Sequence, residues 1–373
     1  MIIRMMIQEE PPQPKLLHPQ PIIATSFPVS KLSYVKKMKV LLLFYFCRNF
    51  KVKIFIYLIT QYKESDVMIF YPEGKTKKCS FETVNQLKEA MMKNEVLESK
   101  VILCDREHNL HVDLGAVRGI IPRVEGAVGI DDGTVRDIAL ISKVNKNVCF
   151  TVLGFQRDIY GNTCAILSRR SVQLMCINEY LSKLKEGDII DARVTHLEKF
   201  GAFIDIGAGI NALIPIDMLS VSRISHPSQR LYEGQDIRVV LRKKEEEKLT
   251  FSLKELLGTW LENAERFTPG ETVTGVIRSI EDYGVFVELA PNLAGLAELR
   301  EDLFPGQQAA VYVKSIIPSK MKIKLVIVEA FGKEERPCPL TYFVKENHID
   351  LWQYSPDDSQ KMIYTDFSLA NAE

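Results

Sequence analysis

A strand-like segment occurs twice in this chain in closely similar form. The first copy reads Lys-Phe-Gly-Ala-Phe-Ile-Asp-Ile over residues 199–206, and the second reads Asp-Tyr-Gly-Val-Phe-Val-Glu-Leu over residues 282–289. The spacing between the two copies, from residue 199 to residue 282, is too long for a solenoid unit but suits a small barrel domain. The repeat therefore predicts tandem copies of one β-rich module.

The similarity extends through a whole module. Before the repeated segment, each copy has a Gly turn followed by a strand, at residues 186–194 and 269–277. After it comes a strand that begins with Gly-Gln, at 234–242 and 306–314. A short closing strand ends each copy, at 248–253 and 322–325. A more divergent unit precedes both over residues 109–122, with His108 and His111 at the two aromatic positions. Three units are therefore expected, the last of them shortened between its middle strands.

Side-chain alternation predicts where the aromatic residues point. In the second unit, the apolar residues of 202–206 share one strand face, whereas Phe203 and Asp205 share the other. A carboxylate beside an aromatic ring indicates the face that meets water. By the same alternation Phe200 would point toward the core, but a bulge at Gly201 would turn its side chain outward beside Phe203.

These exposed aromatic residues have two interpretations. Phe200 and its counterpart Tyr283 could simply cover the rim of each barrel. Exposed aromatic residues that recur as pairs at one position are harder to explain by packing, and they are typical of a platform for stacked bases.

At this point the chain resembles a known family, the S1 RNA-binding domain, a five-stranded OB-fold repeated in bacterial ribosomal protein S1. The resemblance is carried by Phe-Gly-Ala-Phe at 200–203, Ala-Leu-Ile-Pro at 212–215, Arg-Ile-Ser-His-Pro-Ser at 223–228 and Leu-Thr-Phe-Ser-Leu at 249–253. It is best over residues 183–258, moderate over 266–328 and weak over 97–172. From about Met68 onward, the arrangement also resembles short bacterial S1-like proteins with three such units.

The resemblance implies that single-stranded RNA lies across the barrel face, with its bases stacked on aromatic rings. The implied stacking residues are Phe200, Phe203, Tyr283 and Phe286. The family often carries a His shortly after the Gly-Leu of the third strand, and this chain has Pro215 and Glu298 there instead. This departure counts against the RNA contact, most of all in the third unit. Because every base offers a π-face, the expected sequence preference is mild.

Basic residues on the same modules are candidates for phosphate contacts. The candidates are Arg193, Arg242, Lys248, Arg278 and Lys314. Arg242 and Lys314 occupy equivalent positions after Gly-Gln, which favours them. For each candidate the alternative is an ordinary solvated charge on a strand edge.

The overall charge argues for modest RNA affinity. Lys and Arg number 48, and Asp and Glu number 48. The first 66 residues carry ten basic and four acidic side chains, so the remaining body is acidic. Because nucleic-acid binding depends on phosphate neutralisation, the sequence indicates either a local basic stripe or a partner other than RNA.

Residues 1–66 differ from the rest of the chain. Five prolines lie within the first 21 residues, and two short apolar runs are interrupted by Arg48, Lys51 and Lys53, which argues against a membrane-spanning helix. We expect a disordered or spurious extension; an anchor on a membrane surface is the alternative. Seven cysteines without a CxxC pair favour a reduced, cytoplasmic compartment.

The predicted fold is mainly all-β, with tandem five-stranded OB-fold (S1-type) barrels joined by short helices. The predicted ranges are 67–95 for a leader with a helix capped by Ser80, 96–172 for a degenerate S1-like domain, 183–258 and 266–328 for S1 domains, and 329–373 for a tail with a hairpin at Glu346-Asn347. Short helices are expected at 171–184 and 253–267. Trp352 is expected to dock on the last barrel.

The sequence predicts a non-enzymatic protein. Its motifs contain no catalytic constellation, and we expect neither a cofactor, a metal nor a small-molecule substrate. The predicted function is binding of single-stranded RNA, namely mRNA, in connection with translation and the small ribosomal subunit. The alternative is a scaffold of OB barrels that has lost RNA binding. A basic stripe beside Phe203 and Phe286 would favour RNA; acidic or apolar surroundings would favour the scaffold.

Overall fold

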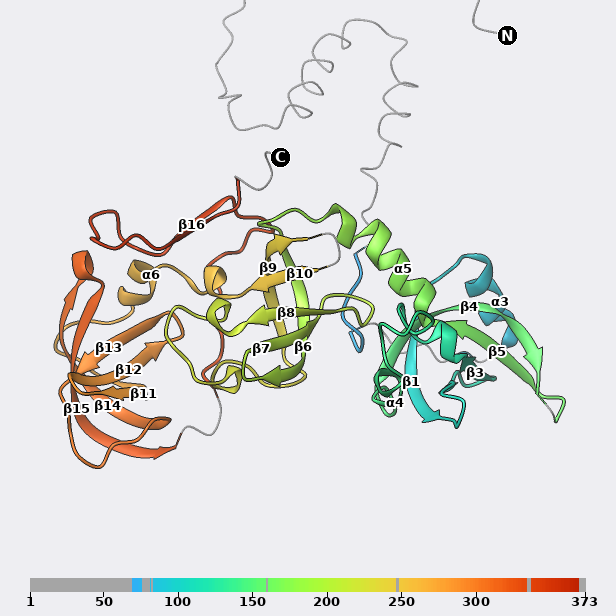
Figure 1. Ribbon diagram of the computed structural model, residues 1–373, viewed down its shortest axis with the longest axis horizontal. Helices are drawn as coiled ribbons and strands as arrows, with labels where there is room; N and C mark the ends of the chain where they lie inside the picture. Colours follow the sequence, from blue (N-terminus) through green and yellow to red (C-terminus); the bar gives the residue numbers. More distant parts are fainter. Residues whose placement is uncertain are drawn as a thin grey trace, which may run out of the picture. The chain divides into compact units, whose positions relative to one another are not determined.

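The computed structural model describes residues 69–75, 81, 83–158, 160–245, 248–333 and 337–368. Its strands form three closed barrels of five strands each (Figure 1). The predicted fold class is therefore confirmed. The interpretation of residues 1–66 lies outside the described residues and stays a prediction. Within the described ranges, no helix is long and apolar enough to cross a bilayer.

The first barrel has the strand order β1-β2-β3-β5-β4, in which only β3 and β5 pair in parallel. Its strands are β1 (Leu97–Cys104), β2 (Leu110–Asp113), β3 (Arg118–Ile121), β4 (Asn147–Arg157) and β5 (Thr163–Ser168). Helix α3 (Val84–Met92) packs Leu87 and Ala90 into the core of this barrel. It begins later than predicted, because Thr83 and Gln86 form a capping box.

The second barrel repeats this topology in the order β10-β8-β7-β6-β9. Its strands are β6 (Ile189–Glu198), β7 (Gly201–Asp205), β8 (Asn211–Pro215), β9 (Asp236–Lys244) and β10 (Leu249–Ser252). Its core contains Ala202, Ile204 and Ile206, as the alternation predicts.

The third barrel follows the order β11-β12-β13-β15-β14. Its strands are β11 (Thr272–Glu281), β12 (Gly284–Ala290), β13 (Leu293–Ala297), β14 (Gln307–Ile317) and β15 (Lys322–Lys333). The predicted shortening lies between β13 and β14.

Short helices precede the second and third barrels. They include α5 (Arg169–Glu179) and η3 (Leu181–Lys183) before the second barrel, and η6 (Lys254–Leu257) and α6 (Trp260–Ala264) before the third. The other short helices within the described ranges are α4 (Ile138–Ile141), η2 (Arg123–Glu125), η4 (Ile216–Met218), η5 (Pro227–Gln229) and η7 (Pro318–Lys320).

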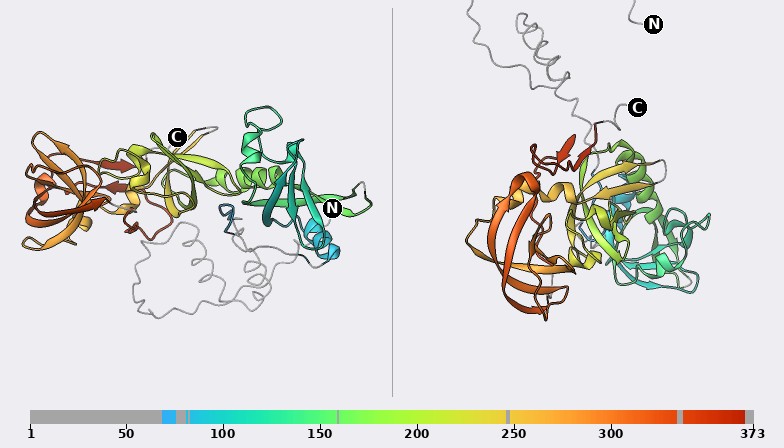
Figure 2. Two further views of the ribbon diagram at one scale, coloured as in Figure 1. Left: turned by 90° about the horizontal axis from the view of Figure 1, so that it is seen from below. Right: turned by 60° about the vertical axis from the view of Figure 1, so that its left-hand side comes forward.

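The C-terminal segment returns to the second and third barrels (Figure 2). Its two strands, β16 (Leu351–Gln353) and β17 (Tyr364–Asp366), pair with each other. The hairpin predicted at Glu346-Asn347 is wrong, because the Asn347 carbonyl accepts a hydrogen bond from Ile189 of β6 instead. Trp352 is buried with the core of the third barrel, as expected.

Candidate nucleic-acid interface

The two aromatic pairs have the same geometry in the second and third barrels. The rings of Phe200 and Phe203 lie 5.9 Å apart at 90°, and those of Tyr283 and Phe286 lie 6.0 Å apart at 88°. Phe200 is 56% exposed and Tyr283 is 70% exposed, whereas the two Phe partners are half-buried. Each barrel therefore presents an edge-to-face aromatic pair to solvent.

The turns that carry these aromatics explain their exposure. Phe200 is the second residue of a two-residue turn, since Glu198 of β6 pairs with Gly201 of β7. The bulge predicted at Gly201 is wrong: the register shift lies on β6, between Val194 and His196. Gly201 instead permits close approach of β8, since an added Cβ would lie 2.3 Å from the Ile214 carbonyl oxygen.

Strand register places further residues beside each Phe. Across the second barrel, His196 pairs with Phe203, Phe203 with Leu213 and Leu213 with Thr250. The corresponding row of the third barrel is Ser279, Phe286, Leu296 and Lys324. Directly paired residues share one face of a sheet, so each row forms a strip on the outside of its barrel.

His196 and Lys324 are candidate RNA contacts that the sequence analysis missed. Lys324 is exposed, flanked by the buried residues Ile323 and Leu325, and has no ion pair with any described residue. Alternation in β15 would have predicted that Lys324 lies on the outer face. That it lies in the row of Phe286 could not be predicted from the sequence, because this depends on which strands pair in the barrel.

His196 lies between two carboxylates. One ring nitrogen lies 2.8 Å from Glu233 and the other lies 2.9 Å from Glu198. These hydrogen bonds, that with Glu233 foremost, raise the pKa of His196 above its ordinary value. The imidazole can therefore carry a positive charge beside Phe203 near neutral pH.

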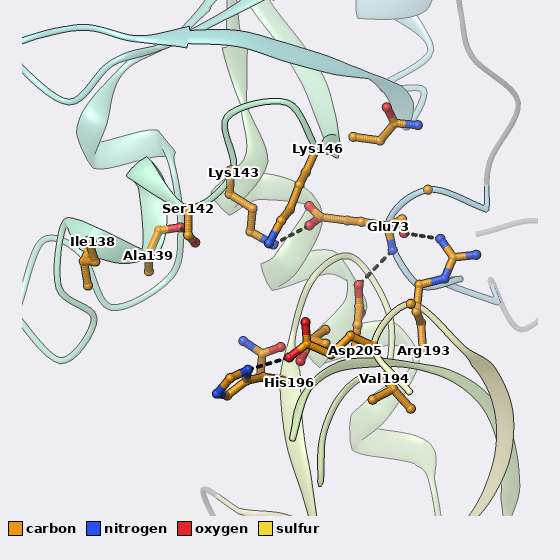
Figure 3. Close-up of a pocket in the computed structure, with 16 residues that line it drawn as sticks. Glu73, Ile138, Ala139, Ser142, Lys143, Lys146, Arg193, Val194, His196 and Asp205 are labelled. Carbon is orange, nitrogen blue, oxygen red and sulfur yellow. Dashed lines mark hydrogen bonds and ion pairs between the residues drawn. The ribbon is translucent and has the colours of Figure 1, made fainter. Parts of the chain in front are cut away.

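Two of the predicted phosphate ligands have structural roles instead. Arg193 forms two hydrogen bonds with the carboxylate of Asp236 and a third, of 3.0 Å, with the carbonyl oxygen of Glu73 (Figure 3). The side chain of Arg278 is only 4% exposed and is paired with Glu288. Burial removes Arg278 from contact with a phosphate on the surface.

The other three predicted cations lie away from the aromatic pairs. Arg242 lies two residues after Val240, which pairs with Ile189. His196 is seven positions further along β6 than Ile189, roughly 23 Å of strand. The guanidinium of Arg242 lies 5.6 Å above the ring of Phe367.

Lys314 occupies the equivalent end of the third barrel and is exposed. Lys248 is also exposed, in the turn between β9 and β10, where its backbone bonds to Glu245. None of the predicted cations therefore lies in the row of either Phe.

The carboxylates beside the two Phe residues do not face water, contrary to expectation. Asp205 is 4% exposed and Glu288 is 5% exposed. They occupy equivalent strand positions, two residues after Phe203 and Phe286. Each is covered by the contact that joins its barrel to the preceding part of the chain.

The contact at Asp205 joins the second barrel to residues 69–75 and to α5. Its carboxylate accepts a hydrogen bond of 2.8 Å from the Glu73 backbone N–H. Burial and the nearby Glu73 charge raise the pKa of Asp205 to about 6. Burial would also raise the pKa of Glu73, but Arg169 and Lys143 outweigh it and lower that pKa to about 2.

The contact at Glu288 joins the second and third barrels. The Glu288 carboxylate pairs with Arg230 of the second barrel and Arg278 of the third, and all three side chains are almost completely buried. Nearby, the Asn292 side chain accepts a hydrogen bond from Val221 and donates to the carbonyl oxygens of Lys254 and Gly258. The two barrels are therefore held together by a satisfied polar network.

A cleft of about 1220 Å³ lies beside the first of these contacts (Figure 3). Its basic residues are Lys143, Lys146, Arg193 and His196, and its acidic residues are Glu73, Asp205 and Glu233. Lys143 is bound to Glu73 at 2.7 Å. The charges in the cleft are thus largely compensated.

Comparison with known proteins agrees with this geometry. The family model described as S1 RNA binding domain matches residues 183–254. The second barrel is an S1 domain. The exposed pair of Phe200 and Phe203 therefore lies on the S1 domain itself, and the third barrel repeats the pair.

Curated relatives support the resemblance to ribosomal protein S1. The small ribosomal subunit protein bS1 of Staphylococcus aureus (strain COL) is 30% identical over 267 residues, which are 67% of this chain and 65% of that protein. The bS1 homolog of Bacillus subtilis (strain 168) is 32% identical over 246 residues, 61% of each chain. This chain thus spans just under two thirds of the relatives that it matches.

A solved structure of a multidomain protein with nucleic acid binding domains from Streptococcus pneumoniae is also similar. It is 13% identical, with a TM-score of 0.23, and the match covers 63% of this chain and 74% of that one.

Proposed function

We propose that this chain binds single-stranded RNA on the outer faces of its second and third barrels. One observation supports the proposal above the others: an exposed edge-to-face aromatic pair occurs twice, at the same turn and strand position. Aromatic rings on OB-type barrels stack nucleobases without regard to sequence, at about 1–3 kcal/mol per base.

The proposed binding relies on stacking more than on charge. Arg193 and Arg278 are engaged in ion pairs, and His196 is flanked by Glu198 and Glu233. Lys324 is therefore the one cation of the two rows without an ion pair to a described residue. Few phosphate contacts imply a weak dependence on salt. Two platforms on one chain would still give useful affinity, since binding at one raises the effective RNA concentration at the other.

The relatives indicate where such binding would operate. They are named as proteins of the small ribosomal subunit. We therefore infer that the RNA is mRNA and that the chain acts with the small ribosomal subunit during translation, in the cytoplasm. The proposed role is one of binding, with no catalytic step.

The proposal predicts a shallow salt slope that one lysine makes steeper. The full chain should bind a fluorescent oligouridine of about twelve nucleotides more tightly than a duplex of equal length. Lys324→Ala should reduce the slope of log K against log salt by about 0.7, the value for one phosphate contact on a single strand. Fluorescence anisotropy over a salt series measures both.

Lys88→Ala is the matched control for Lys324, because Lys88 is an exposed lysine on α3, which packs on the first barrel. Equal slopes for the two variants would exclude Lys324 from the interface. Tighter binding of the duplex would contradict the proposed function itself.

RNA affinity should also fall as pH rises. The pKa of His196 is raised, so the protonated, cationic ring persists above pH 6.5 and is lost as pH increases through the shifted value. We expect severalfold weaker binding at pH 8.5 than at pH 6, and a flat profile for His196→Gln. His348→Gln is the control, since its pKa is raised too but it lies beside Asp188. A pH dependence that survives in His196→Gln would contradict this role.

A further inference from the structure

A second kind of exposed aromatic residue recurs in the two barrels. Tyr232 precedes β9 and is 59% exposed, and Phe304 precedes β14 and is 48% exposed. They occupy equivalent positions, each three residues before the Gln of the Gly-Gln motif. We propose that Tyr232 and Phe304 each stack a further base, which extends the RNA path beyond the aromatic pair. This inference rests on the proposed function.

Both residues are presented by a turn that is fixed in the same way. The side-chain oxygen of Gln235 accepts a hydrogen bond of 3.1 Å from the Tyr232 N–H, and that of Gln307 accepts one of 3.3 Å from the Phe304 N–H. The carbonyl oxygens of Tyr232 and Phe304 accept bonds from the backbone N–H groups of the same two Gln residues. The backbone of each exposed residue is therefore held before any ligand arrives, which reduces the entropy lost on binding.

Each turn is bonded to the strand beside the platform. The N–H of Gly234 donates to the Val194 carbonyl oxygen at 2.8 Å, and that of Gly306 donates to the Ile277 carbonyl oxygen at 2.7 Å. Both glycines have a left-handed backbone, with φ of 83° and 89°. Glycine adopts this conformation without the steric cost that other residues incur.

These bonds place the turns next to the aromatic rows. The register shifts of β6 and β11 begin at Val194 and Ile277, each two residues before the residue that pairs with Phe203 or Phe286. In the second barrel, Glu233 of the turn also binds His196, the neighbour of Phe203. Tyr232 therefore lies beside the end of the Phe203 row that is on β6, and Phe304 lies beside the end of the Phe286 row that is on β11.

The chemistry favours a base over a phosphate at these positions. Glu233 follows Tyr232 directly, and its carboxylate would repel a phosphate. A ring offers a π-face to any nucleobase. A single exposed aromatic residue needs no explanation, but recurrence on a fixed turn beside the same platform is not explained by packing.

A series of oligouridines from two to ten nucleotides tests the inference on the full chain. We expect Tyr232→Ala/Phe304→Ala to weaken binding of the longest oligomer about tenfold. The same variant should reach its plateau affinity with an oligomer one or two nucleotides shorter than the parent requires. Tyr232→Phe/Phe304→Tyr, which keeps both rings, should behave like the parent. Tyr364→Ala is the matched control, because Tyr364 is 60% exposed on β17.

The outcomes separate this inference from the proposed function. If the parent binds RNA and the Ala double variant matches it in both affinity and required length, the inference is overturned while the proposed function stands. If the Phe/Tyr exchange weakens binding as much as the Ala variant does, stacking on these rings is likewise excluded. Failure of the parent to bind would remove the proposed function itself.

Discussion

Phe203→Ala/Phe286→Ala is expected to lower the RNA affinity of the full chain by about 30-fold or more. Each substitution removes the strand ring of one edge-to-face pair. Loss of one stacked base costs about 1–3 kcal/mol. Because the two sites assist each other through effective concentration, the double variant should lose more affinity than either single variant. Fluorescence anisotropy with oligouridine measures the loss.

Two controls separate stacking from a general loss of structure. Phe203→Tyr/Phe286→Tyr keeps both rings and should retain most of the affinity. Tyr160→Ala removes a ring that is 80% exposed in the turn between β4 and β5 of the first barrel, and should leave binding unchanged. Equal affinities for the Ala double variant and the parent would place the protein among scaffolds that do not bind RNA through these faces.

Glu288→Gln is expected to have the largest effect on stability. Its carboxylate is the shared partner of Arg230 and Arg278, whose side chains are 2% and 4% exposed. Neutralising it would leave two buried guanidinium groups facing each other. Removal of one member of a buried ion pair typically costs about 3–5 kcal/mol. The contact between the second and third barrels should therefore open well before either barrel unfolds.

Hydrogen exchange resolves this effect better than a single melting curve, because a chain of several barrels need not unfold in two states. In Glu288→Gln, the amides around Arg230 and in β12 should lose protection, whereas those of the first barrel should keep theirs. Glu329→Gln, an exposed carboxylate on β15, is the control. Protection that is the same in both variants would show that the buried triad does not hold the barrels together.

The sequence predicted the fold because its evidence was local and repeated. Alternation from Ala202 to Ile206 places Ala202, Ile204 and Ile206 in the core, as the second barrel shows. Asp205 is the exception, because it is buried although it alternates with these core residues. The same alternation placed Phe203 and Phe286 on the outer face. The duplicated module then implied that the barrels would recur along the chain.

The roles of the charged residues depend on contacts that alternation cannot report. Arg278 carried the signature of a phosphate ligand, yet it meets Glu288 on the neighbouring strand together with Arg230 from another barrel. Alternation would place the Asp205 side chain on the surface, but its carboxylate is covered by Glu73, whose backbone N–H donates a hydrogen bond to it.

Long-range pairing also explains the candidates that were missed. His196 and Lys324 reach the Phe rows only through the pairing of β6 with β7 and of β13 with β15. The C-terminal segment is similar, since hydrogen bonds to the second barrel replace the hairpin that its own sequence favours.

Photocrosslinking most directly tests the central claim that RNA bases stack on these aromatic residues. The full chain would be irradiated with oligouridine that contains 4-thiouridine, and the adducts mapped by mass spectrometry. The account predicts adducts on Phe200 or Phe203 of the second barrel and on Tyr283 or Phe286 of the third. Adducts confined to lysine and arginine residues elsewhere, with none on these four aromatic residues, would contradict it.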